Sequence, residues 1–291
     1  MNFFTAILNG LSSGGTYAII ALGYTMVYGI AKMLNFAHGD IIMIGGYAMY
    51  VALSFAGHPL LALAVAIVFC VILGVVIERA AYRPLRGASP LAVLITAIGV
   101  SYLLQSLAQI IFGSAPKKPM GFFVQGNVKL GSISIDISTL ITLGVTVVVM
   151  TALTLFIKFS KTGRAMIAVS EDRDAALLMG INTHAIISIT FAIGSALAAI
   201  AAYLMFIKTP NLSNTMGAMP GIKAFTAAVI GGIGSIPGAM LGGVLLGVVE
   251  SISYSIPALA PFTDAVEFSI LIVILLVKPA GLIGKARREK V

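Results

Sequence analysis

A short segment in the second half of the chain combines charged residues with small and apolar ones in a pattern that suits a contact between proteins. It runs from residue 170 to residue 182 as Ser-Glu-Asp-Arg-Asp-Ala-Ala-Leu-Leu-Met-Gly-Ile-Asn. Glu171 and Asp172 stand where the N-terminus of a helix favours negative charge, and Gly180 stands where a left-handed residue would end that helix. About nine residues between them make a helix of roughly 13 Å, too short to cross a membrane. The segment therefore predicts a surface helix.

The two sides of this predicted surface helix differ in character. Ala175, Leu178 and Met179 form an apolar side, whereas Asp172 and Arg173 lie at a charged end. A compact helix of this kind could bind in a cleft of a partner protein. The alternative interpretation is a solvated connection that happens to contain a surface helix.

Three polar residues, Asn35, His38 and Asp40, lie between two apolar blocks of the sequence. Polar side chains at membrane depth are costly and often functional, so these residues are candidates for a cytoplasmic gate on a transport path. A structural interpretation is also open, because Asp40 precedes an apolar run and suits a helix N-cap, while Asn35 and His38 could satisfy backbone groups. A proton relay through His38 and Asp40 would need a second buried acid, which we do not expect at the centre of the apolar blocks.

Glycines recur at one-turn spacing later in the chain, as Gly234-x-x-x-Gly238-x-x-x-Gly242. Small residues at this spacing permit close contact between helices, so the pattern predicts packing, either within the subunit or across a dimer interface. Glu250 lies toward the end of the same apolar block, where an unpaired charge would be costly. We therefore expect Glu250 to lie at the membrane interface or to pair with a neighbouring subunit.

The sequence lacks the signatures of soluble enzymes. It lacks the G-x-x-x-x-G-K-[ST] motif that binds nucleotide phosphates. Its one Gly-x-Ser-x-Gly string, Gly10-Leu-Ser-Ser-Gly14, lies within an apolar block and not at the strand-to-helix turn that exposes a nucleophilic serine. The three histidines, His38, His58 and His184, lie in different blocks, and the one cysteine, Cys70, lies within an apolar run. These residues do not have the spacing of metal ligands. We therefore expect a protein that is not an enzyme, has no catalytic residues and holds neither a metal nor a cofactor.

The composition of the chain indicates which secondary-structure elements must position the candidate residues. Of the 291 residues, 59% are hydrophobic and 10% are charged, and the mean hydropathy is +1.07. Soluble domains are nearer to about 25% charged, so most of this chain must be surrounded by lipid. A helix needs about 20 apolar residues to cross a membrane. Eight apolar blocks therefore predict an all-α, polytopic bundle of about eight transmembrane helices in one domain, residues 1–291; the blocks cover residues 3–30, 41–56, 60–77, 91–112, 140–157, 185–207, 222–256 and 265–277.

Two of these blocks contain glycine-rich interruptions. The first block carries Gly10-Leu-Ser-Ser-Gly14-Gly15, and block 222–256 carries Gly231-Gly-Ile-Gly-Ser-Ile-Pro-Gly238. We expect interrupted or re-entrant helices at both places.

The net charge of +8 arises from short basic clusters between apolar blocks and not from one basic face, so nucleic acid is not an expected partner. Basic clusters mark cytoplasmic segments of membrane proteins. This rule places residues 78–90, residues 158–184 and the basic C-terminal tail in the cytoplasm, and residues 113–138 outside. A cytoplasmic tail further requires block 222–256 to enter the membrane and return.

Four motifs spread over nearly the whole chain resemble one family. They are Leu34-Asn-Phe-Ala-His-Gly-Asp40, Ile77-Glu-Arg-Ala-Ala-Tyr-Arg-Pro-Leu-Arg-Gly87, the segment from Glu171 to Asn182, and Gly232-Ile-Gly-Ser-Ile-Pro-Gly-Ala-Met-Leu-Gly-Gly243. Together they look like the membrane permease subunits of branched-chain amino acid ABC importers.

This resemblance implies a permease in the cell inner (plasma) membrane that moves branched-chain or related amino acids. It implies a second homologous permease subunit, two cytoplasmic ATPase subunits and an external solute-binding protein as partners, besides membrane lipid. It also implies that residues 158–184 form a cytoplasmic coupling loop, whose docking residues are Glu171, Asp172, Arg173, Ala175, Leu178 and Gly180. The fullest form of the family's loop has Ala-Ala directly after the glutamate, whereas here that pair stands at positions 175 and 176.

Two other classes of protein were weighed against the permease. An ion-coupled secondary transporter of small polar solutes would need inverted repeats and carboxylates near the middle of the membrane, and neither is evident. A membrane-embedded enzyme would need a nucleophile or a metal constellation, which is missing. A permease subunit that depends on partner ATPases is the preferred interpretation.

Overall fold

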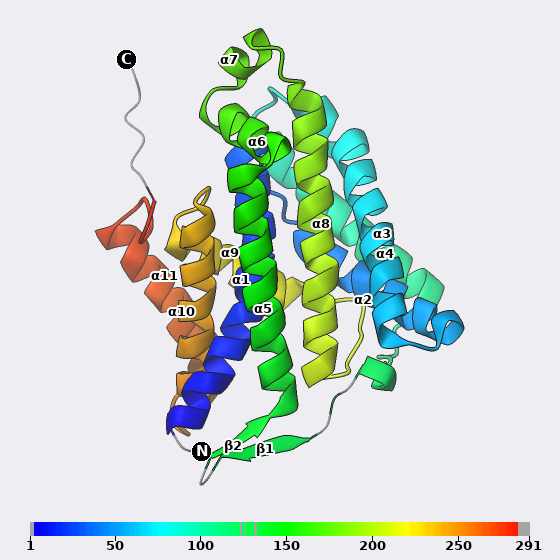
Figure 1. Ribbon diagram of the computed structural model, residues 1–291, viewed down its shortest axis with the longest axis vertical. Coiled ribbons are helices and arrows are strands. Elements are labelled where there is room, and N and C mark those ends of the chain that lie inside the picture. Colours follow the sequence, from blue (N-terminus) through cyan, green and yellow to red (C-terminus); the bar gives the residue numbers. More distant parts are fainter. Residues whose placement is uncertain (1–2, 123, 125, 131–132, 285–291) are drawn as a thin grey trace.

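The computed structural model describes residues 3–122, 124, 126–130 and 133–284, and these are almost entirely helical (Figure 1). The α-helices are α1 (Phe3–Ala31), α2 (His38–Ala56), α3 (Pro59–Ile77), α4 (Pro90–Phe112), α5 (Ile137–Phe159), α6 (Lys161–Glu171), α7 (Arg173–Leu178), α8 (Thr183–Lys208), α9 (Ala218–Gly231), α10 (Ile236–Ser255) and α11 (Thr263–Val277). The π-helical turn Glu78–Tyr82 extends α3. Strands β1 (Asn127–Leu130) and β2 (Ile133–Asp136) pair antiparallel, with Asn127 opposite Asp136. The all-α prediction is confirmed.

Seven helices of the described chain are long and apolar enough to cross a membrane: α1, α3, α4, α5, α8, α10 and α11. The outside of the bundle is apolar. Leu60, Ile110 and Leu276, for example, are 59%, 80% and 80% exposed, and apolar surface on this scale fits lipid better than water. The chain is therefore a multi-pass membrane protein. The number of long apolar helices is one fewer than the eight or so blocks predicted, because the block that forms α2 does not meet this criterion.

The first helix is continuous, so the predicted interruption near its glycines is wrong. α1 has 29 residues. Its glycines bring it close to α10: a Cβ atom added to Gly10 would lie 2.7 Å from Cα of Val248, and one added to Gly14 would lie 2.8 Å from Cα of Val244. The glycines serve close helix packing and do not break the helix.

The second glycine-rich block does divide, as predicted, into two helices that meet near Ser235. The chain leaves α9 through Gly232 and Gly234, which have φ of +108° and +93°. Ser235 then caps α10 by accepting a hydrogen bond from the amide of Gly238 at 3.2 Å. α9 has 14 residues, a length of about 21 Å. It is therefore too short to cross the membrane alone.

The three glycines of the repeated pattern have different surroundings. A Cβ atom on Gly238 would overlap the carbonyl oxygen of Gly231, and one on Gly242 would overlap that of Ala227. These two glycines therefore let α10 pack closely on α9 within one subunit. Gly234 instead lies in the turn before α10, and its positive φ, more than any helix contact, accounts for a glycine there.

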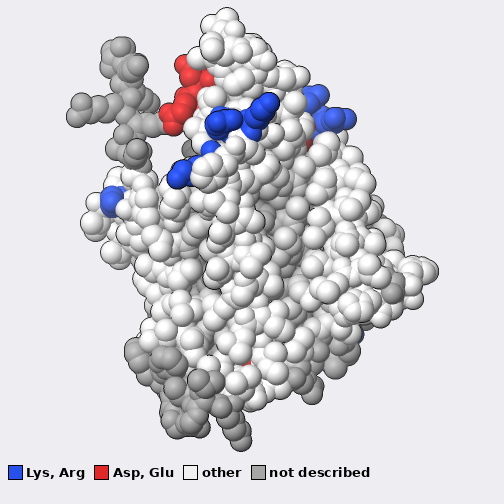
Figure 2. Space-filling model, in the orientation of Figure 1, with Lys and Arg blue, Asp and Glu red and all other residues white. Residues whose placement is uncertain are grey.

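Charged side chains gather at one end of the bundle. α6 and α7 lie at one end, and β1 and β2 lie at the other (Figure 1). Figure 2 shows charged side chains gathered around α6 and α7, while the visible flank of the bundle is almost free of them. Arg86 contacts His184 at this end, so the basic segments 78–90 and 158–184 share a face. The end of the basic tail, residues 285–291, lies outside the described residues, and its cytoplasmic position remains a prediction.

Opposite ends of the bundle should be accessible from opposite sides of the membrane. Ser114 and Asp174 are exposed at the two ends. In a Cys70→Ala background, which removes the one native thiol, Ser114→Cys should react with a membrane-impermeant thiol reagent in intact cells. Asp174→Cys should react only in inverted vesicles. Labelling of both positions from the same side would contradict the topology.

Candidate functional site

The predicted surface helix exists, with its cap and its final turn. In the loop of residues 158–184, α7 is capped by Asp172, whose Oδ1 accepts hydrogen bonds from the amides of Asp174 and Ala175 at 3.0 and 2.9 Å. Gly180 follows α7 with φ of +80°. This left-handed conformation is the one that its position predicted.

The helix is shorter than predicted, and its orientation differs. α7 has six residues, not about nine, because Glu171 is the last residue of α6 and Asp172 breaks the helix with extended backbone (φ −149°, ψ 113°). The residue of α7 that is buried is Ala176, at 4% exposure. Ala175 and Leu178, predicted on the apolar side, are both exposed. The helix therefore points its apolar groups outward.

The tip of the loop presents large apolar side chains to water. Leu177, Leu178 and Met179 are 59%, 89% and 82% exposed, at the end of the molecule where the charges gather (Figure 2). Exposed apolar groups beside charges are typical of a protein contact surface. The six residues predicted for docking are all exposed, and we call them the candidate docking surface; their docking role stays a prediction. They are Glu171, Asp172, Arg173, Ala175, Leu178 and Gly180.

The turn after α7 should be sensitive to side chains that disfavour positive φ. No atom of the described residues lies within 4 Å of a Cβ atom built on Gly180, so backbone conformation is what limits substitution there. Gly180→Val should distort the docking surface at a cost of roughly 1–2 kcal/mol, whereas Gly180→Asn should be tolerated because asparagine adopts this conformation more readily. Copurification of the ATPase subunit that the family resemblance leads us to expect would measure the difference. Equal yields from the two variants would contradict a role for the turn.

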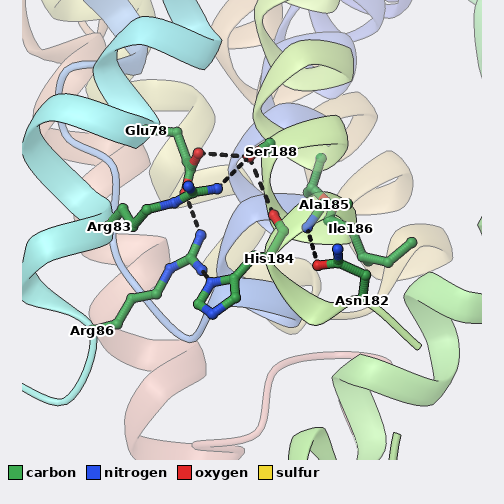
Figure 3. A network of polar contacts seen from close by, with 9 residues as sticks. Glu78, Arg83, Arg86, Asn182, His184, Ala185, Ile186 and Ser188 are labelled. Atoms are coloured by element: carbon green, nitrogen blue, oxygen red, sulfur yellow. Dashed lines mark hydrogen bonds and ion pairs between the residues drawn. The ribbon is translucent and has the colours of Figure 1, made fainter. Parts of the chain in front are cut away.

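A buried polar network joins the end of α3 to the start of α8 (Figure 3). It lies where the loop of residues 158–184, which we call the docking loop, leads into α8. Glu78 is fully buried, forms ion pairs with Arg86 and, at 3.6 Å, with Arg83, and accepts a hydrogen bond from the Ser188 hydroxyl at 2.6 Å. Arg86 also contacts the His184 ring. We call these five residues the Glu78 network. It ties the loop to the helices of the membrane bundle.

The charges of the network depend on one another because they are largely withdrawn from water. Burial lowers the pKa of the Arg86 guanidinium, and the Glu78 carboxylate opposes that shift. Arginine nevertheless stays protonated at neutral pH. Removing one partner would therefore leave an uncompensated buried charge, which typically costs about 3–5 kcal/mol.

Glu78→Gln should lower the thermal unfolding temperature of the purified protein, because glutamine keeps the shape but not the charge that Arg86 requires. The expected loss of stability is about 3 kcal/mol or more. Glu171→Gln is a matched control, since Glu171 is exposed and makes none of the ion pairs found among the described residues. A Glu78→Gln protein that unfolds at the wild-type temperature would show that the network carries little energy.

The π-helical turn links the Glu78 network to the connection between α1 and α2. Tyr82 is 1% exposed, and its hydroxyl donates a hydrogen bond to Oδ1 of Asn35 at 2.7 Å. π-helical turns are rare and occur frequently at functional sites. Asn35 is therefore joined by Tyr82 to the same π-helical turn that carries Glu78.

The connection between α1 and α2 is non-helical, and the three candidate gate residues lie in it or just after it. Asn35, His38 and Asp40 are buried, with exposures of 2%, 1% and 3%. Asp40 is not the N-cap, because α2 already begins at His38; instead its Oδ1 accepts a hydrogen bond from Nε2 of Gln105 in α4 at 2.8 Å. The His38 ring packs edge-on against Tyr24, with centroids 4.8 Å apart. A gating role for the three residues stays a prediction.

The start of α2 also meets the start of α9. A Cβ atom on Gly39 would lie 2.5 Å from the carbonyl oxygen of Gly217, the residue before α9. α2 therefore begins inside the protein, against the residue that precedes α9, and each of the two helices follows a non-helical connection. Non-helical backbone at membrane depth is tolerated only when it is buried in protein or lines a cavity.

A second buried cluster corrects the prediction for Glu250. Its carboxylate pairs within the subunit, with Nζ of Lys223 at 2.6 Å, and accepts a hydrogen bond from the Tyr17 hydroxyl at 2.9 Å. Lys223 also reaches Asp264 at 2.9 Å and Glu267 at 3.3 Å. The cluster therefore joins α1, α9, α10 and α11 around one lysine.

Sequence reasoning treated neither cluster as a unit. Glu78 directly follows an apolar block and precedes three arginines, but the sequence analysis interpreted those arginines as topology signals and as part of a family motif, not as ion-pair partners of Glu78. Lys223, Glu250 and Glu267 each lie within an apolar block. One base and two acids in successive blocks is a signal for a buried ion cluster, and it was available in the sequence.

The long apolar helices and the apolar outside of the bundle define a multi-pass membrane protein. The family model described as branched-chain amino acid transport system / permease component matches residues 6–275. The permease protein BraD of Pseudomonas aeruginosa, from a high-affinity branched-chain amino acid transport system, is 44% identical over 303 residues, which cover 100% of this chain and 98% of BraD. LivH of Escherichia coli K12, named in the same way, is 44% identical over 302 residues, with 99% and 98% covered. The chain belongs to this family of permease components, as the four motifs indicated.

A solved structure supports the fold independently of sequence. PsaBC from Streptococcus pneumoniae, in complex with Fab, superposes with a TM-score of 0.53, covering 96% of this chain and 93% of that chain. The two sequences are 14% identical. The likeness therefore concerns the fold alone.

Proposed function

We propose that this chain is the membrane-spanning subunit of an inner-membrane ABC importer for branched-chain or related amino acids. In this proposal it works with a second homologous permease subunit, two cytoplasmic ATPase subunits and an external solute-binding protein. The observation that carries the proposal is 44% identity, over essentially the whole chain, to permease proteins named for branched-chain amino acid transport.

The proposed mechanism transmits ATPase closure from the docking surface to the α1–α2 connection. Movement of α7 would pull on α8 through the docking loop, and α8 carries His184 and Ser188 of the Glu78 network. The network would pass the movement to the π-helical turn, where Tyr82 holds Asn35 at 2.7 Å. A shift of Asn35 would then change the packing around His38 and Asp40, which we propose as gate residues.

Reconstitution tests the proposal directly. Proteoliposomes that contain this permease with its permease and ATPase partners should take up labelled leucine, isoleucine or valine. Uptake should require ATP on the side of the membrane where the ATPase subunits lie and the binding protein on the opposite side. Matched liposomes with a hydrolysis-deficient ATPase should show no uptake. ATP hydrolysis without uptake of any of the three would overturn the proposed substrate.

The buried cluster around Lys223 is the one observation that favours an ion-coupled secondary transporter. It supplies the intramembrane carboxylates that such a transporter uses. Each of the three carboxylates, however, lies within 3.3 Å of the same ammonium, an arrangement that suits a structural ion cluster. A protonophore should therefore leave ATP-driven uptake unchanged, and uptake that collapses with the proton gradient in the presence of ATP would favour this alternative.

A further inference from the structure

A cavity of about 310 Å³ lies where the last turn of α8 approaches the middle of α1 and the connection to α9. This volume is at the lower end of the range of about 300–1,000 Å³ that is typical of small-molecule sites. The cavity lies away from the Glu78 network, toward the opposite end of α8. Its lining includes Lys208, Ser13, Tyr17, Asn211, Met205 and Met216.

Lys208 is a half-buried cation whose hydrogen-bond partner, among the described residues, is a hydroxyl group. Its Nζ donates a hydrogen bond to Oγ of Ser13 at 3.3 Å. Among the residues that the structure describes, no carboxylate lies within 4.0 Å of this ammonium. Ammonium groups at membrane depth are normally paired. The cavity therefore offers an anion a favourable site beside Lys208.

The other groups that line the cavity suit the ammonium group and the aliphatic side chain of an amino acid. The Tyr17 hydroxyl already donates its proton to Glu250 at 2.9 Å, so the Tyr17 oxygen is left to accept a hydrogen bond, as an ammonium group requires. The amide of Asn211 adds a further acceptor. Met205 and Met216 supply apolar, adaptable surface, which accommodates branched aliphatic groups.

We propose that this cavity binds the transported amino acid within the permease itself, with Lys208 contacting the α-carboxylate. The inference rests on the proposed function, because it assumes that a branched-chain amino acid enters the subunit. Tyr17 and Asn211 accept hydrogen bonds from the α-ammonium group, and the methionines contact the side chain. α8, which has 26 residues and a length of about 39 Å, runs from this site to His184, so one helix contacts both the solute and the Glu78 network.

Ligand binding to the purified permease and ATPase complex, without the binding protein, tests the site. We expect labelled L-leucine to bind, 4-methylpentanoate to compete because it keeps the carboxylate, and 3-methylbutylamine to compete poorly because it lacks it. Lys208→Gln should weaken leucine binding by roughly 10- to 100-fold, as expected for a charge-assisted hydrogen bond. Lys208→Arg should retain most of the affinity.

Lys118→Gln is the matched control, since Lys118 is exposed and does not line the cavity. Each variant must still copurify with the ATPase, which shows that it is folded. If the wild-type complex imports leucine and Lys208→Gln binds and transports leucine as the wild type does, the site is wrong and the proposed function stands. If the wild-type complex imports none of the branched-chain amino acids, the proposed function itself fails.

Discussion

Tryptophan in place of Ala175 should abolish ATP-driven uptake while the permease still inserts and reaches its normal abundance. Ala175 is exposed near the start of α7, so the larger side chain can extend into solvent. There it would occupy space that the ATPase needs at the docking surface. We expect the affinity for the ATPase to fall by roughly 30-fold or more, the effect of losing a contact worth about 2 kcal/mol. Copurification after mild detergent extraction and leucine uptake would measure it.

Ala175→Ser is the matched control, because serine adds one oxygen and leaves the surface almost unchanged. It should retain both the ATPase and uptake. Membrane abundance of the two variants should be equal, since neither alters a buried contact. A tryptophan variant that keeps the ATPase and transports at the wild-type rate would mean that residues 158–184 are only a surface connection.

Local chemistry explains why much of this docking loop could be predicted from sequence. An aspartate whose oxygen can reach amides two and three residues later, and a glycine that takes positive φ, determine where a helix begins and ends with little help from the rest of the fold. Both features appear at Asp172 and Gly180. The exposure of Leu178 could not be predicted in the same way, because it depends on how α7 sits on α8 and not on its own sequence.

Glycines show the limit of local reasoning. The runs at Gly10 to Gly15 and Gly231 to Gly238 look alike in sequence, yet the first lies inside one helix and the second includes a turn. The difference lies in their partners: Gly14 touches α10, whereas Gly232 and Gly234 take positive φ. Tertiary contacts determine whether each glycine ends a helix or lets the helix pack closely against another one.

Buried charges escaped prediction because each residue was judged alone. Glu250 by itself is a costly group that requires a partner, and Lys223 by itself is a base in an apolar block. Their pairing becomes evident only when α9, α10 and α11 are brought together. A sequence shows that such a charge must be compensated, but not which helix supplies the compensation.

Removing the ammonium of Lys223 should have the largest effect on stability of any single substitution in this cluster. Lys223→Met would leave Glu250 and Glu267, which are 8% and 0% exposed, without their shared cation. Breaking a buried pair in this way typically costs about 3–5 kcal/mol, which is a large part of the stability of an ordinary domain. We expect a strong loss of folded protein in the membrane. The yield of monodisperse protein after extraction and its thermal unfolding temperature would measure the loss.

Simultaneous replacement of the acids distinguishes an uncompensated charge from a lost contact. Lys223→Met combined with Glu250→Gln and Glu267→Gln removes the lysine charge and the charges of the two buried acids together. Neutral replacements of buried ion clusters are often well tolerated. The triple variant should therefore recover most of the folded yield, and it should also transport if the cluster is only structural. Recovery of folding without any transport would instead assign the cluster a part in the transport cycle, and failure to recover folding would show that the contacts of the Lys223 side chain, more than its charge, hold α9, α10 and α11 together.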